Sequence, residues 1–126
     1  MDDQLFHREQ LLQFQRFSGR LEAQAAEPDG ESLRPLAEAF AAVAADPGIL
    51  HEDAPALVAR LFTVAPAYAQ DFPRDLLWYL GADCLHFMPD EEIDQFNALD
   101  EDRRSAAERG LRFDWSGAVA SYRTLQ

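Results

Sequence analysis

The sequence has 126 residues and a formal net charge of −12, from 23 acidic and 11 basic side chains. All of the basic residues are arginine. Because phosphate binding needs a basic surface, nucleic acid is not an expected partner of so acidic a chain. With 48% hydrophobic residues the sequence is too apolar to be disordered, and its length predicts one domain over residues 1–126.

Membrane and secretion signals are not expected in this chain. The longest stretch without a charged side chain, residues 61–70, is far shorter than the roughly 18 apolar residues that cross a bilayer. The start, Met1-Asp2-Asp3, lacks the basic and then apolar layout of a secretory signal. A single cysteine, Cys84, suits a reducing compartment. These features predict a cytoplasmic protein that does not enter a membrane.

Apolar residues recur at helical spacing through the first half of the chain. The first helix is predicted from Asp2 or Asp3 to about Ala26. Ser32 is expected to cap a second helix, which ends at the Asp-Pro-Gly sequence of residues 46–48. The apolar stripes of these helices are Phe14, Phe17, Leu21 and Ala25 in the first and Leu33, Leu36, Phe40 and Val43 in the second.

A third helix is predicted to begin at a cap formed by Asp53 and to kink or end at Pro66. A fourth helix is predicted over residues 73–87. Apolar residues cover more than half of its circumference, so we expect it to lie centrally in the fold and to be covered on most sides.

The C-terminal part carries three more helix signals. Asp90 lies at the start of a fifth helix, and the charged run from Asp100 to Arg104 is expected to open a short sixth helix that Gly110 closes. Asp114 is expected to cap the last helix, whose apolar face is Trp115, Val119 and Tyr122. No run of alternating β-branched residues occurs, so the sequence predicts an all-α irregular bundle of six or seven helices.

Four polar residues share the remaining narrow side of the predicted central helix. These candidates for a catalytic or binding site are Asp75, Tyr79, Asp83 and His86. Their spacings of four, four and three residues place neighbours within reach of each other on a helix. One interpretation is the solvent face of a core helix. The other is a groove in which an aspartate raises the basicity of His86.

Metal binding has an incomplete ligand set in this sequence. Asp83 and His86 form one pair with the spacing of helical ligands, whereas protein metal sites need three or four. His7 and His51 lie near predicted helix starts and are expected to be exposed polar residues. Cys84 is expected to be a buried small apolar residue. No cofactor is therefore predicted.

Acidic residues concentrate in the segment after the central helix. The candidates for partner binding there are Glu91, Glu92, Asp94, Asp100, Glu101 and Asp102. Such a run is either a solvated face or a docking surface for a basic partner. The aromatic stripe of the first helix is expected to lie in the core, although part of it would also suit pairing with a second copy, so a homodimer is possible.

No motif of a hydrolase, metalloprotease or phosphate loop is present. The sequence therefore favours a non-enzymatic protein that binds another protein, as an adaptor, assembly factor or regulator. The alternative is a small helical enzyme or metal-binding protein that uses the Asp/Tyr/His group of the central helix. A mimic of nucleic acid is a weaker idea, because arginines are interspersed among the carboxylates.

Overall fold

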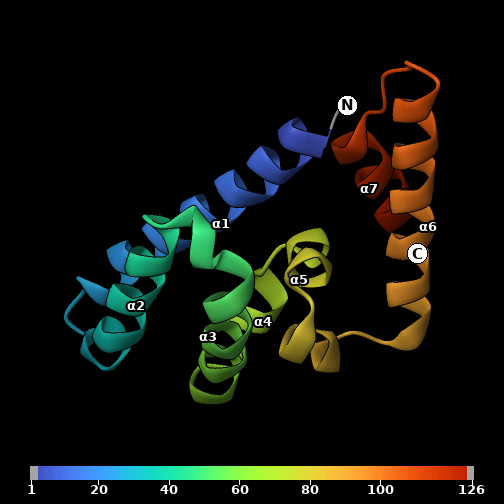
Figure 1. Ribbon diagram of the computed structural model, residues 1–126. Helices are drawn as coiled ribbons and strands as arrows, with labels where there is room; N and C mark the ends of the chain where they lie inside the picture. Colours follow the sequence, from blue (N-terminus) through green and yellow to red (C-terminus); the bar gives the residue numbers. More distant parts are fainter. Residues whose placement is uncertain (1–2, 125–126) are drawn as a thin grey trace.

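The computed structural model describes the backbone of residues 3–124 and the side chains of residues 3–121 (Figure 1). Asp2 and the side chain of Tyr122, which enter two of the predictions, lie outside this range. Within it the chain is all helical, as predicted, and no helix is long and apolar enough to cross a membrane. The seven α-helices are α1 (Asp3–Ala25), α2 (Arg34–Ala44), α3 (Leu50–Val64), α4 (Tyr68–Asp71), α5 (Arg74–Leu80), α6 (Asp90–Glu108) and α7 (Trp115–Thr124), joined in part by the 3-10 segments η1 (Glu31–Leu33), η2 (Pro47–Ile49) and η3 (Ala82–Phe87).

The short helix α5 lies between the two ends of the bundle. The long helix α1 packs along α2, and α2 packs on α3, at one end (Figure 1). Helices α6 and α7 pack together at the other end. Helix α5 contacts α1, α3 and α6, so its side chains lie within reach of both groups of helices.

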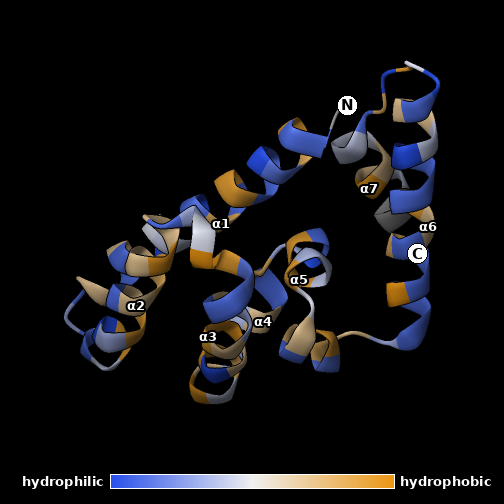
Figure 2. Cartoon of the chain, viewed as in Figure 1, coloured by the Kyte–Doolittle hydropathy of each residue, from blue (hydrophilic) through white to orange (hydrophobic). Residues whose placement is uncertain are grey.

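The predicted apolar stripes of the first two helices are confirmed, because every member of both is buried. Phe14 of α1 stacks on Phe40 of α2 with ring centroids 5.4 Å apart. Phe17 makes an edge contact with Phe72 at 4.7 Å. Hydrophobic and hydrophilic stretches alternate along these helices, as the colours of Figure 2 show. Burial of each valine, leucine or phenylalanine in these stripes stabilises the fold by about 1.5–3 kcal/mol, which explains why spacing alone located the core.

Two predicted helix caps are wrong and one is confirmed. Ser32 lies inside η1, and neither η1 nor α2 has a side-chain cap. Helix α3 begins at Leu50, so Asp53 lies in its first turn and not before it. By contrast, Asp114 does cap α7, because its carboxylate accepts a hydrogen bond of 3.0 Å from the backbone N–H of Gly117.

The predicted central helix over residues 73–87 is wrong in its extent. Helix α5 ends at Leu80, because Gly81 has φ +67° and Ala82 has φ +48°. Glycine adopts positive φ without steric cost, so the chain turns here and continues as η3. The expected burial holds for Leu76, Leu77, Leu80 and Cys84, whereas Phe87 at the end of the segment is 36% exposed.

The short helix expected at residues 100–110 is also wrong, because these residues continue α6 without a break. Only its end was predicted correctly. Gly110 has φ +69°, its N–H bonds to Ala107, and the N–H of Leu111 bonds to the carbonyl of Ala106 at 2.8 Å. This is the Schellman arrangement that commonly closes a helix at glycine.

Candidate functional site

The four candidate residues do not share one face, because the chain turns at Gly81 between them. Asp75 and Tyr79 belong to α5, whereas Asp83 and His86 belong to η3 and are exposed. Their predicted alignment along one helix is therefore wrong. The structure instead gives Asp75 and Tyr79 separate surroundings, each assembled from other helices.

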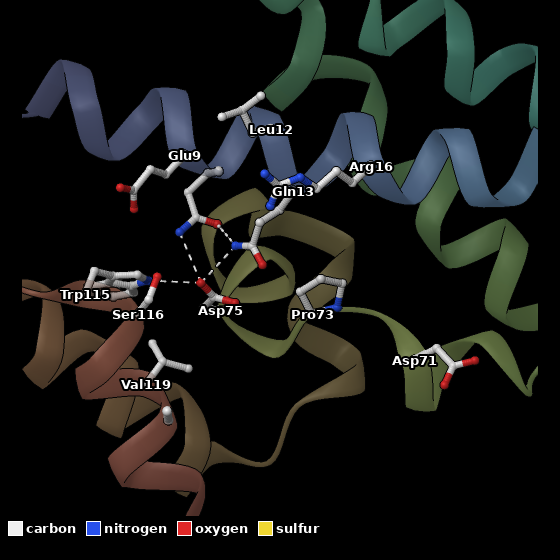
Figure 3. Close-up of a pocket in the computed structure, with 12 residues that line it drawn as sticks. Glu9, Leu12, Gln13, Arg16, Asp71, Pro73, Asp75, Trp115, Ser116 and Val119 are labelled. Carbon is white, nitrogen blue, oxygen red and sulfur yellow. Dashed lines mark hydrogen bonds between the residues drawn. The ribbon is translucent and has the colours of Figure 1, made fainter.

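The Asp75 side chain is the most highly connected polar group in the candidate site. It is only 8% exposed, and its Oδ2 atom accepts three hydrogen bonds (Figure 3). Gln10 Nε2 donates at 3.2 Å and Gln13 Nε2 at 3.0 Å, both from α1, and Trp115 Nε1 donates at 2.9 Å from α7. Asp75 thus joins α1, α5 and α7 through one oxygen atom.

Local structure explains why these donors converge. Gln10 and Gln13 are three residues apart, so they lie on one face of α1, and Gln13 Nε2 also donates to Gln10 Oε1 at 2.9 Å. Trp115 is the first residue of α7, where the Asp114 cap fixes the direction of the helix. Three N–H donors from two other helices therefore converge on one acceptor atom of Asp75.

A cavity of about 630 Å³ opens beside Asp75, between α1, the start of α5 and α7. Figure 3 shows side chains from all three helices around it. Its polar lining includes Glu9, Arg16, Asp71 and Ser116 together with the Asp75 group, and its apolar lining includes Leu12, Pro73 and Val119. A volume of this size is typical of ligand sites. The arrangement can bind and orient a polar group, because acceptors and apolar walls lie side by side.

Tyr79 lies in a second group of polar aromatic residues. Its hydroxyl forms a hydrogen bond of 2.5 Å with His7 Nδ1 from α1, and its ring centroid is 4.6 Å from that of His51 in α3. Burial raises the pKa of Tyr79 above its ordinary value. Both histidines are exposed, as expected, but the sequence did not indicate that they would meet at Tyr79.

Comparison with known proteins places the whole bundle in one family. A family model described as PA2817-like matches residues 3–125. The chain belongs to the PA2817-like family. No curated protein and no solved structure matches it. The match spans both ends of the bundle, so the Asp75 cavity and the Tyr79 group lie within the part of the chain that the PA2817-like model covers.

Within residues 3–124, possible metal ligands of this PA2817-like chain do not form a cluster. No group of three or more histidine, cysteine, aspartate or glutamate side chains is close enough to hold an ion there. Asp83 and His86, the metal candidates, are exposed residues of η3.

Cys84 is fully buried, as predicted, and its Sγ atom lies 3.9 Å from the carbonyl oxygen of Pro55. Burial, together with the nearby charge of Asp83, raises the pKa of the thiol to about 12. The thiolate is the reactive form, so at neutral pH almost none of it is present.

We therefore expect the Cys84 thiol of the folded protein to react with iodoacetamide at pH 8 at least about a hundredfold more slowly than a thiol of ordinary pKa, because burial lowers both the thiolate population and access. Alkylation followed by mass spectrometry over time measures this rate. The matched control is the same chain in denaturant, where Cys84 should react at the rate of a free cysteine. Equal rates in the two states would contradict the expectation.

The acidic candidates in α6 fall into two groups. Glu92 pairs with Arg74, and Asp100 pairs with Arg103 at 2.8 Å and with Arg104 at 3.3 Å. The remaining candidates are exposed and form no ion pair within the described residues: Glu91, Asp94, Glu101 and Asp102. Among the described residues, this second group can meet a partner without breaking an ion pair.

Sequence reasoning missed Gln10, Gln13 and Trp115 as members of the site. One signal for Gln10 was present, because it lies between Phe6 and Phe14 at helical spacing, in line with the buried stripe of α1. A polar side chain at such a position needs a hydrogen-bonding partner inside the fold. That partner, Asp75, lies 65 residues away in the sequence, so the residues around Gln10 do not indicate which residue it is.

Proposed function

We propose that this protein is a non-enzymatic, cytoplasmic protein-binding protein, an adaptor, assembly factor or regulator, that holds a segment of a partner in the Asp75 cavity. The observation that carries the proposal is the cavity itself, of about 630 Å³, between three helices. Its floor is a buried, hydrogen-bonded carboxylate, and Leu12, a large apolar side chain that is 41% exposed, lies on its wall. An exposed apolar side chain beside oriented polar groups is typical of a binding surface.

The distribution of candidate side chains favours binding over catalysis. General base catalysis requires the base to lie within hydrogen-bond reach of the group that it activates. The cavity lining contains the Ser116 hydroxyl but neither His7, His51 nor His86. The Asp/Tyr/His group that an enzyme would need is divided between the cavity, the Tyr79 group and the surface of η3.

Charge supports a basic partner. The formal net charge of −12 favours encounter with a positively charged surface. Helix α6, which carries the exposed acidic side chains, lies at the same end of the bundle as α7 (Figure 1). In this proposal α6 steers the partner and the cavity holds it.

The test is zero-length carbodiimide cross-linking of the tagged protein in a lysate of its own cells, followed by mass spectrometry. Because the chain has no lysine, each cross-link joins one of its carboxylates to an amine of another protein, apart from its own N-terminal amine. Ser116→Trp fills the cavity from α7, and Ser121→Trp places the same ring on the same helix at an exposed position outside the cavity lining. The proposal expects one stoichiometric partner for the wild type and Ser121→Trp that is lost with Ser116→Trp.

A second pair of variants tests the role of α6. Glu91→Gln with Asp94→Asn removes two free charges, whereas Glu92 is left intact because it holds Arg74. Capture of the same partner should become weaker with this double variant, and more so at low ionic strength, where charge attraction is least screened. A partner that still binds Ser116→Trp at full yield contradicts the proposal.

A further inference from the structure

The floor of the cavity has unused hydrogen-bond acceptors. The two N–H groups of Gln13 Nε2 donate to Gln10 Oε1 and to Asp75 Oδ2. The Oε1 atom of Gln13 accepts no hydrogen bond from the described residues 3–124. All three hydrogen bonds to Asp75 end on Oδ2, so Oδ1 is equally available within the same range. A ligand that fits this floor must therefore bring donors.

The floor also has unbalanced negative charge. In the part of the chain that the structure describes, no arginine or histidine forms an ion pair with Asp75. Two more carboxylates, Glu9 and Asp71, line the cavity, against the single guanidinium of Arg16. A buried carboxylate that has only neutral partners gains more from an added cation than an exposed one, because little water competes there.

We propose that this cavity binds the primary ammonium group of a lysine side chain of the partner, with Asp75 Oδ1 and Gln13 Oε1 as its acceptors. This inference rests on the proposed function and gives its chemistry. An ammonium is a compact charge with three donors, which suits two separate acceptors. A guanidinium binds best by a two-pronged contact with both oxygens of a carboxylate, and here Oδ2 is already occupied.

The composition of the chain indicates where the lysine comes from. The protein contains no lysine, so a second copy of it has no lysine side chain to offer. The occupant is therefore a different protein. Leu12 and Val119 on the cavity walls supply apolar surface for the methylene stem of that lysine, which packs on apolar groups while its charged end stays with the acceptors.

The test uses the indole N–H signals of the two tryptophans in an NMR titration of the whole protein. Trp115 reports on the site, because its Nε1–H bonds to Asp75. Trp78 bonds to Asn97 and should shift less, since it senses the site only through its stacking on Trp115, with ring centroids 5.8 Å apart. The probes are three capped amino acids: Nα-acetyl-lysine methylamide, the arginine equivalent and the norleucine equivalent, which has the apolar stem without the charge. The lysine probe should shift the Trp115 signal in a saturable manner, the arginine probe less, and the norleucine probe not at all.

Two variants make the result specific. Asp75→Asn keeps an oxygen for the three protein donors but replaces Oδ1 by an amide N–H donor and removes the charge, and we expect it to weaken lysine binding at least about tenfold. Gln13→Ala removes the second acceptor from a partly exposed position, so it tests the same site should Asp75→Asn fail to fold. Any of three results would overturn the inference: the lysine probe gives no saturable Trp115 shift, the norleucine probe gives an equal shift, or both variants bind lysine as the wild type does. If the lysine probe does not bind but Ser116→Trp still loses its partner, the protein-binding proposal stands and the lysine inference is wrong. If the lysine probe binds but Ser116→Trp keeps its partner, the cavity is an amine site that does not hold the partner.

Discussion

Replacing Asp75 by alanine is expected to lower the free energy of unfolding by about 3 kcal/mol, because a buried donor that loses its acceptor costs about 1–3 kcal/mol. The Nε1–H of Trp115 and the Nε2 of Gln10 would both lose theirs. Both side chains are almost completely buried, so water reaches them poorly. Gln13 keeps its second hydrogen bond, to Gln10, and should add little.

Urea denaturation of matched variants measures this effect. Asp75→Asn retains an oxygen acceptor of the same shape and is expected to cost less than half as much as Asp75→Ala. Asp83→Ala is the control, since Asp83 belongs to the same predicted stripe but is exposed, and surface substitutions usually change stability by less than about 0.5 kcal/mol. A similar small cost for Asp75→Ala would mean that its hydrogen bonds do not hold α1, α5 and α7 together.

Periodicity predicted the core well where helices are long and one-sided. The stripes of α1 and α2 repeat over several turns, and burial of each apolar side chain outweighs the details of caps and ends. Caps depend on the path of the chain just before the helix, which spacing does not reveal. Ser32 and Asp53 are therefore misplaced, although the helices that they were meant to start exist.

The predicted central helix failed at one residue. A helical wheel assumes a constant turn of about 100° per residue, and Gly81 with positive φ ends that regularity. Burial survives such a break because apolar side chains still turn inward, as Cys84 does. The common face is lost at the break, so Asp83 and His86 in η3 do not lie on the same side as Asp75 and Tyr79 in α5.

The candidate site could be predicted only in part, because its contacts are long range. Asp75 and Tyr79 both lie on α5, and their role as site residues stays a prediction. Their partners come from distant parts of the sequence: Gln10 is 65 residues from Asp75, and His7 is 72 residues from Tyr79. Local spacing carries no information on such pairs. The polar residues of α5 therefore find their partners only when α1 packs against α5 in the folded chain.

Replacing Arg103 by alanine is the other substitution with a large expected effect, a loss of about 3 kcal/mol in the free energy of unfolding. Its side chain is only 5% exposed and lies between helices α6 and α1. The guanidinium donates to Asp3 at 2.6 Å and to Asp100 at 2.8 Å, and its central carbon lies 4.1 Å from the centroid of the Phe6 ring. Alanine would remove both hydrogen-bonded pairs, the cation–π contact and the packing of the stem.

The adjacent Arg104 provides the control, because the same change removes the same charge from the same turn of α6. Arg104 is 59% exposed and makes one ion pair with Asp100 at 3.3 Å, a type of contact worth about 0.3–0.5 kcal/mol. Chemical denaturation of the two variants should therefore separate them by more than about 2 kcal/mol. Equal losses of stability in the two variants would show that the cost of burying the charged Arg103 guanidinium cancels the stabilisation from its partners.

Acid titration of stability separates the ion pair from the packing of Arg103. The hydrogen bond and charge of Arg103 hold the pKa of Asp3 below its ordinary value of 3.8. A carboxylate whose pKa is lower in the folded state contributes stability that is complete above its unfolded pKa and is lost as the pH falls through its folded pKa. Below about pH 4 the wild type should thus lose this contribution, which Arg103→Ala lacks at every pH. The stability difference between the two proteins should narrow there, and the part that persists comes from the other contacts of Arg103, which include its packing on Phe6. A difference that stays constant down to pH 2 would mean that the Asp3 pair adds nothing to the fold.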